Sequence, residues 1–272
     1  MTVFVCIACG TLYPDDDVPP PACPICRDER QFVPPGGQEW TTREKLAARH
    51  KPTFAAEGEL LGIGIAPDFA IGQRTLLVRT PAGNVLWDCV PLLTPATVDL
   101  IGGIGGLAAI AISHPHYYSA MADWAEAFDC PVLLHAADRE WVMRPSRRIE
   151  FWEGERRPLL PGLTLVRCGG HFAGGTVLHV DAAARRKPAL LVGDILQVTP
   201  GCDRLGFMRS YPNYLPLGPR AVEAVAAALH GLDFEAIYGA FWGRVVPEGG
   251  RAVLEASVAR HVAWASDRAA EI

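Results

Sequence analysis

Apolar residues gather in short, nearly continuous runs along most of this chain. Such runs occupy residues 107–112, 132–134, 177–180, 189–192 and 234–238. Runs of this length, bounded by turn or charged residues, are typical of buried strands. Residues 42–50, 119–128 and 250–268 instead have the spacing expected of helices. Because half of the 272 residues are hydrophobic, the chain can bury a full α/β core.

Two histidines follow directly on the predicted strand at residues 107–112. His114 and His116 are separated by Pro115. Two imidazoles spaced in this way at the end of a strand can point into one cavity. Because neutral imidazole nitrogens are common metal ligands, this segment is a candidate metal site.

A third histidine and an aspartate come later in the chain. His171 follows Gly169 and Gly170, and glycine lets the backbone turn tightly. Asp194 comes directly after the apolar strand that ends at Gly193. A carboxylate at the end of a buried strand is costly without a partner for its charge. We therefore expect Asp194 to have such a partner.

These segments together resemble the metallo-β-lactamase superfamily. His114 and His116 take the first two histidine places of its H-x-H-x-D-H motif. His171 resembles its third histidine ligand, and Asp194 resembles its metal-bridging aspartate. The hairpin at residues 75–88 resembles the opening hairpin of the same fold. The resemblance covers residues 57–265 and implies an α/β protein with a four-layer αβ/βα sandwich.

The motif departs from the family at the positions that would hold a second ion. Tyr118 falls on the aspartate and Ser119 on the last histidine of the motif. After the last core strand, residues 239–243 read Gly-Ala-Phe-Trp-Gly and contain no histidine. We therefore expect one zinc, iron or manganese ion, held by His114, His116, His171 and Asp194.

The two replacements are also candidate catalytic residues. Tyr118 could donate a hydrogen bond to a developing oxyanion, and Ser119 could orient a water molecule. Alternatively, Tyr118 and Ser119 fill the space of the missing ion, and Ser119 caps the following helix as a favoured N-cap residue.

The N-terminal segment carries a second metal signal. Its four cysteines form two Cys-x-x-Cys pairs, Cys6 with Cys9 and Cys23 with Cys26. This spacing is typical of a tetrahedral four-thiolate site. The pairs resemble those of rubredoxins, rubrerythrin tails and zinc ribbons, which leaves open zinc for folding or iron for electron transfer. We predict a ribbon domain at residues 1–40 and a metallo-β-lactamase-like domain at 41–272, joined by a linker near residues 32–38.

Charge and composition exclude several classes of function. The chain has 25 Lys and Arg against 30 Asp and Glu, a net charge of −5, which predicts neither nucleic-acid nor membrane binding. Its longest apolar runs are far below the roughly 20 residues of a membrane span. We expect a cytoplasmic protein with a small-molecule substrate. The two alternatives for assembly are a homo-oligomer and a protein partner bound through the ribbon.

The leading functional hypothesis is a mononuclear metal-dependent hydrolase of a small carbonyl or ester compound. Metal-bound water would be the nucleophile. We expect the turn at residues 211–214, Tyr-Pro-Asn-Tyr, to touch the substrate. Two alternatives are a mononuclear non-haem iron oxygenase or redox protein, and a metal-binding interaction module without catalysis.

Overall fold

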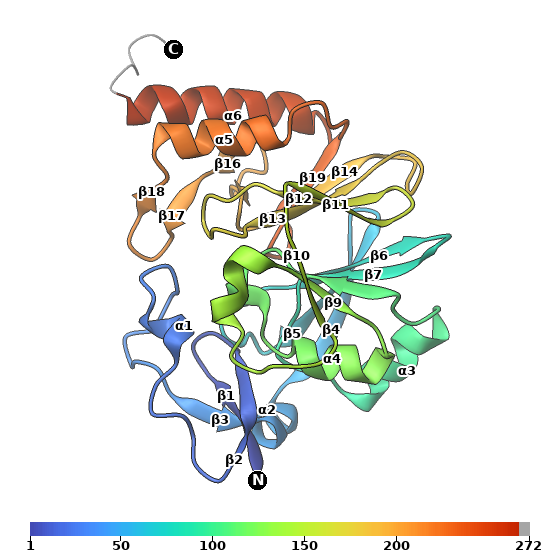
Figure 1. The fold of residues 1–272 in the computed structure, drawn as a ribbon, viewed down its shortest axis with the longest axis vertical. Coiled ribbons are helices and arrows are strands. Elements are labelled where there is room, and N and C mark those ends of the chain that lie inside the picture. The colour runs from blue at the N-terminus through green and yellow to red at the C-terminus, as the bar shows by residue number, and fades with distance from the viewer. Residues whose placement is uncertain (267–272) are drawn as a thin grey trace.

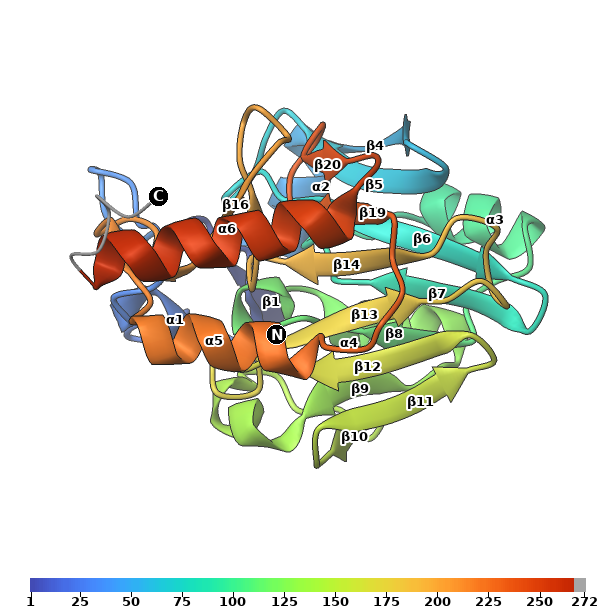
Figure 2. The same cartoon turned by 90° about the horizontal axis from the view of Figure 1, so that it is seen from above.

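Two large sheets pack face to face, and helices cover their outer faces (Figure 1). The computed structural model describes residues 1–266. Viewed from above, α5 and α6 lie across one sheet (Figure 2), whereas Figure 1 shows α3 and α4 on the far side of the other. The order of layers is therefore helix, sheet, sheet, helix, as the sequence predicted.

The first sheet has seven strands in the order β10-β9-β8-β7-β6-β5-β4. Its strands are β4 (Lys51–Glu57), β5 (Leu60–Ala66), β6 (Thr75–Thr80), β7 (Gly83–Trp87), β8 (Ala109–Ala111), β9 (Val132–His135) and β10 (Ile149–Trp152). β4 to β7 pair in antiparallel fashion, and β7 to β10 pair in parallel. The parallel strands β7 and β8 end at the same edge, where the histidine motif follows.

The second sheet has six strands in the order β11-β12-β13-β14-β19-β20. Its strands are β11 (Arg156–Leu160), β12 (Leu163–Arg167), β13 (Thr176–Val180), β14 (Ala189–Gly193), β19 (Ala236–Gly239) and β20 (Val245–Val246). Two small hairpins lie between β14 and β19 in the chain: β15 (Gln197–Val198) with β16 (Leu205–Gly206), and β17 (Met208–Ser210) with β18 (Leu215–Pro216).

The helices of the sandwich are few and short. They are α2 (Arg43–Arg49), α3 (Pro95–Gly103), α4 (Met121–Phe128), α5 (Pro219–Ala228) and α6 (Gly250–Ala265), with the 3₁₀ segments η1 (Pro115–Tyr117) and η2 (Ala136–Trp141). The helix expected at 119–128 begins at Met121, because Ser119 and Ala120 form a turn in which Ser119 has a positive φ of 24°. Its N-cap position is Ala120, so the prediction that Ser119 caps this helix is wrong.

Side-chain alternation along the strands builds the layers. On β6, Leu76 faces the apolar layer between the two sheets, whereas Leu77 faces the layer beneath α3 and α4. On β14, Leu191 joins the layer between the sheets, whereas Leu190 packs beneath α5 and α6. Successive residues of a strand point to opposite faces, so strands that are apolar throughout are buried on both sides.

The N-terminal ribbon has its own small sheet and helix. Its elements are β1 (Thr2–Cys6), β2 (Leu12–Asp16), α1 (Pro24–Arg27) and β3 (Trp40–Thr42), with the sheet order β2-β1-β3. β3 spans the domain boundary predicted at residue 40, because it pairs with β1. In Figure 1 the ribbon lies at the edge of the sandwich, next to the β17–β18 hairpin.

Within residues 1–266, no helix is both long and apolar enough to cross a bilayer.

Candidate metal centre

Three histidine side chains meet at one edge of the sandwich. One ring nitrogen each from His114, His116 and His171 lies within 4.8 Å of the others. The ring centroids are 5.0 to 5.2 Å apart. Each Nε2 atom is buried and has no hydrogen-bond partner among the residues that the structure describes. Three buried nitrogens without partners fit a bound metal ion, because buried polar atoms otherwise find a hydrogen bond.

A chain of hydrogen bonds orients His114. The Ser113 backbone N–H and hydroxyl both donate to Asp88 Oδ1, each at 2.7 Å. Because its own proton goes to Asp88, Ser113 Oγ accepts from His114 Nδ1, 2.9 Å away. His114 therefore carries its proton on Nδ1, and its Nε2 lone pair is free to bind a metal.

Two backbone carbonyls orient His171 in the same way. Its Nδ1 donates to the carbonyl oxygens of Met208 at 3.2 Å and Arg209 at 3.0 Å. Carbonyls accept only, so Nδ1 is protonated and Nε2 is bare. The loop around His171 needs glycine at position 175, because a Cβ there would lie only 2.5 Å from the Gly169 carbonyl oxygen.

Burial keeps all three imidazoles neutral. It lowers the pKa of His114 and His116 well below the usual value, and the repulsion that a second protonated imidazole would exert lowers it further. Burial also lowers the pKa of His171 to about 4. Neutral imidazole is the form that binds metals, so the cluster is ready for an ion at neutral pH.

Asp194 lies beside the histidines at the end of β14. Its Oδ1 is buried without a hydrogen-bond partner in the described chain. Burial raises the pKa of this carboxyl to about 7, against the opposing effect of the Tyr117 hydroxyl. Asp194 and His116 both line a cavity of about 320 Å³. The group of three close nitrogens does not include Asp194, so the structure places it next to the cluster rather than in it.

Tyr118 and Ser119 point elsewhere. Tyr118 is buried in the core between the seven-stranded sheet and its helices. The Ser119 hydroxyl donates to the Tyr117 carbonyl at 3.4 Å. Neither residue lines the cavity. The tyrosine next to Asp194 is Tyr117, which sequence reasoning did not select, and its pKa is raised by burial and then by the charge of Asp194.

An arginine and a glutamate form a buried ion pair next to the loop at residues 239–243. Arg74 is 1% exposed and forms a 2.9 Å ion pair with Glu57. Its Nη1 donates to the Gly239 carbonyl at 2.8 Å, and its positive charge acts on Asp88 and Tyr117. Trp242 packs against β5 over Gly62 and Gly64. Residues 239–243 thus bind side chains of the sandwich instead of supplying a metal ligand.

The cavity has walls from distant parts of the chain. The ribbon contributes Arg30, Gln31 and Phe32. From the turn at 211–214, Tyr211 and Pro212 line the cavity, whereas Tyr214 is 86% exposed. Sequence reasoning missed the three ribbon residues, because no local pattern marks them.

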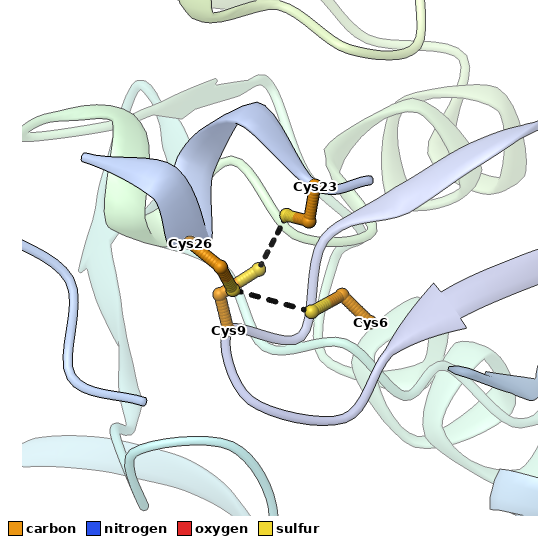
Figure 3. A group of neighbouring side chains, drawn as sticks. All are labelled: Cys6, Cys9, Cys23 and Cys26. Atoms are coloured by element: carbon orange, nitrogen blue, oxygen red, sulfur yellow. Dashed lines mark hydrogen bonds between the residues drawn. The ribbon is translucent and has the colours of Figure 1, made fainter. Parts of the chain in front are cut away.

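The four cysteines form the second cluster, shown in Figure 3. Their sulfur atoms all lie within 4.8 Å of one another. Cys6 and Cys26 Sγ are 3.4 Å apart, and Cys9 and Cys23 Sγ are 3.6 Å apart. Thiolates around a tetrahedral zinc with bonds of about 2.3 Å would be about 3.8 Å apart, whereas disulfide sulfurs are about 2.05 Å apart. The arrangement therefore fits a metal ion better than a pair of disulfides.

The ribbon also supplies partners for the sulfurs. The Tyr13 hydroxyl donates to Cys23 Sγ at 3.1 Å, and Cys9 Sγ lies 3.2 Å from Thr11 Oγ1. Hydrogen bonds from Cys26, and then from Cys6 and Cys9, lower the pKa of Cys23. These hydrogen bonds stabilise the thiolate of Cys23, and the thiolate is the metal-binding form of cysteine.

Comparison with known proteins gives one close sequence relative. The uncharacterized protein YmaE of Bacillus subtilis (strain 168) is 43% identical over 267 residues, which cover 96% of each chain. No family model matches the chain.

Solved structures show the fold. VMB-1 aligns with a TM-score of 0.58 at 12% identity, covering 80% of this chain and 98% of its own. The DIM-1 metallo-β-lactamase aligns at 0.55 with 12% identity over 77% and 95% of the two chains. TTHA1623, solved in a di-iron-bound form, aligns with a TM-score of 0.50 at 22% identity, covering 70% of this chain and 96% of its own. The sandwich is thus a metallo-β-lactamase fold.

Proposed function

Because this chain belongs to the same family as YmaE and has the metallo-β-lactamase fold, we propose that it is a mononuclear metal-dependent hydrolase of a small carbonyl or ester compound. The observation that carries this proposal is the cluster of three buried, neutral imidazoles whose Nε2 atoms lack hydrogen-bond partners in the described chain.

The proposed ion would be held by His114, His116 and His171, with Asp194 as a fourth ligand. Three imidazoles and a carboxylate suit zinc, ferrous or manganous ions. Asp194 shares the cavity wall with His116 and has a buried oxygen without a partner. When bound, such an ion lowers the pKa of a coordinated water to about 7 and so provides a hydroxide nucleophile at neutral pH.

A single ion is supported by what surrounds the histidines. Among the described residues, the groups of three or more close potential ligands are the three histidines and the four cysteines. Arg74 already supplies a buried positive charge near Asp88 and Tyr117. The Tyr117 hydroxyl is fully buried beside Asp194, and we assign it the role of orienting that carboxylate. Oxyanion stabilisation by Tyr118 and water orientation by Ser119 stay predictions, and none of these three residues lines the cavity.

The four-cysteine cluster is proposed to hold one zinc or iron ion. A segment of about 40 residues has too small a core to fold without a covalent or metal link, so a structural zinc is favoured. Electron transfer by iron would instead need a redox partner for the cluster.

Metal analysis of the full chain tests the proposal. We expect two ions per chain by mass spectrometry, and one after His116→Ala, with the remaining ion at the cysteines. Cys23→Ser is the matched variant for the other site. Two ions per chain in His116→Ala would contradict the assignment of the histidine site.

A screen of esters and lactones tests the reaction. We expect hydrolysis by the wild-type protein and none by His116→Ala. Iron at the histidine site together with substrate-dependent oxygen consumption, without hydrolysis, would replace this proposal by the oxygenase alternative.

A further inference from the structure

A short segment of the ribbon reaches the histidine cluster. Arg30 is 8% exposed, and its Nη1 donates to the backbone carbonyl of His171 at 3.2 Å. Its guanidinium carbon lies 3.7 Å from the centre of the Phe172 ring. Arg30 therefore touches both the backbone of one histidine and the residue that follows it.

Phe172 transmits this contact to all three imidazoles. Its ring centroid is 4.9 Å from that of His116, 5.1 Å from His171 and 5.4 Å from His114. A cation stacked on an aromatic ring is attracted by the π electrons. Arg30 thus holds the Phe172 ring in place against the histidine cluster.

The guanidinium of Arg30 is itself fixed. Its Nε donates to Asp28 Oδ1 at 2.5 Å and its Nη2 to Asp28 Oδ2 at 2.7 Å. A paired contact of this kind sets the plane of the guanidinium as well as its position. Its Nε, Nη1 and Nη2 all donate hydrogen bonds within the protein. Arg30 is therefore suited to positioning other residues rather than to binding a free anion.

The neighbouring residue, Glu29, binds the β17–β18 hairpin, which orients His171. Its carbonyl accepts from Ser210 Oγ at 2.5 Å and from Asn213 Nδ2 at 2.8 Å. Its carboxylate forms a 3.2 Å ion pair with Arg209, whose carbonyl accepts from His171 Nδ1. The ribbon therefore contacts the loop that carries His171 through Arg30. Through Glu29 it contacts the β17–β18 hairpin, whose carbonyls accept from His171 Nδ1.

At its other end, this segment is attached to the cysteine cluster. Residues 28–30 directly follow α1, which carries Cys26. The Asp28 N–H donates to the Ile25 carbonyl at 3.2 Å, and the Arg27 N–H donates to the Cys23 carbonyl at 3.1 Å. An ion bound by the four cysteines would thus fix the start of the segment that reaches His171.

We propose that Arg30 is a positioning residue for His171, and that through it an ion in the four-cysteine ribbon tightens the binding of the ion at the histidine site. This inference rests on the proposed function, because it requires that the histidines bind a metal.

Cobalt titration of the metal-free full chain tests it. Cobalt bound to four thiolates gives intense charge-transfer absorption, which a site of histidines and carboxylate lacks, so the two sites are measured separately. The variant is Arg30→Gln. The matched control is Arg27→Ala, which removes an exposed arginine three positions earlier in the same ribbon.

We expect the wild type to bind two cobalt ions. In Arg30→Gln, the Kd of the histidine site should rise about 10- to 100-fold, the range found when groups supporting a ligand are removed. The thiolate absorption should be unchanged, and Arg27→Ala should match the wild type at both sites. An unchanged histidine-site Kd in Arg30→Gln would overturn the inference.

Two further results are decisive. If the wild type binds cobalt at the cysteines alone, the proposed metal centre fails, and the inference fails with it. If Arg30→Gln also loses the thiolate absorption, the ribbon itself is damaged, and the Arg30→Lys variant is then used to test the positioning role. Lysine keeps the charge without the planar fork, so it should retain the ribbon and still weaken the histidine site.

Cys23→Ser tests the role of the ribbon ion. We expect it to lose the thiolate absorption and to weaken cobalt binding at the histidines by a similar factor. Wild-type affinity at the histidines after loss of the thiolate site would show that Arg30 acts without the ribbon ion and would overturn that half of the proposal.

Discussion

The hydroxyl of Tyr211 donates a 2.7 Å hydrogen bond to the backbone carbonyl of Asp194. The bond joins the turn at 211–214 to the end of β14, where Asp194 borders the cavity. It fixes the backbone from which the Asp194 carboxylate projects.

Tyr211→Phe should therefore weaken the histidine site while keeping the aromatic wall. We expect about a 10-fold loss of metal affinity and about 1 kcal/mol of stability, measured by metal titration and urea unfolding. Tyr214→Phe is the control, because Tyr214 is 86% exposed. Equal metal affinity in the two variants would contradict a role for the Tyr211 hydroxyl.

Ser113→Ala should remove the acceptor that orients His114. The variant loses the contact to His114 Nδ1 and one of the two bonds to Asp88. We expect metal affinity to fall about 10- to 100-fold. Ser257→Ala is the matched control, since its buried hydroxyl accepts from the Leu205 N–H in the layer beneath α6. It should lower stability without changing metal affinity.

Asp138 should make stability depend on pH. Burial raises its pKa to about 6, although the Gly174 N–H, Arg30 and Arg167 oppose the rise. The unfolded value is about 3.9, so the folded state binds the proton more tightly. This contribution to stability is present below pH 4 and is lost as the pH rises through 6.

Asp138→Asn keeps an acceptor for the Gly174 N–H but cannot ionise. Relative to the wild type, its stability should therefore improve between pH 4 and pH 8, by up to about 3 kcal/mol. Urea unfolding at both pH values measures this. The same stability difference at the two pH values would show that Asp138 does not titrate in this range.

The buried ion pair of Arg74 and Glu57 should be sensitive to loss of either partner. Arg74→Met leaves the Glu57 carboxylate and the Gly239 carbonyl without this donor. We expect a loss of about 3–5 kcal/mol. The double variant Arg74→Met/Glu57→Gln should recover part of it, as measured by a double-mutant cycle in urea. Additive losses would show that the pair is not coupled.

Local signals predicted the histidines and the sandwich. An apolar strand or a glycine turn directly precedes each candidate ligand, namely His114, His116, His171 and Asp194. Their position at the edge of a sheet can therefore be predicted from the local sequence. The choice between Tyr117 and Tyr118 could not be made in this way. The 3₁₀ turn of η1 decides which of the two side chains faces Asp194, and its direction depends on packing against the core.

The role of Arg30 had no sequence signal. Its contact with His171 joins residues 141 positions apart, and nothing in the local pattern pairs them. The domain boundary at 40 was placed from the linker composition, which does not reveal that Trp40–Thr42 pairs with β1.

The cavity wall at residues 30–32 also bears on how this protein is made. The ribbon is synthesised before the sandwich, yet the partners of Glu29 and Arg30 come 141 to 184 positions later. The pocket therefore closes only after most of the chain has left the ribosome. Until then, residues 29 and 30 lack the partners that hold the ribbon against the His171 loop.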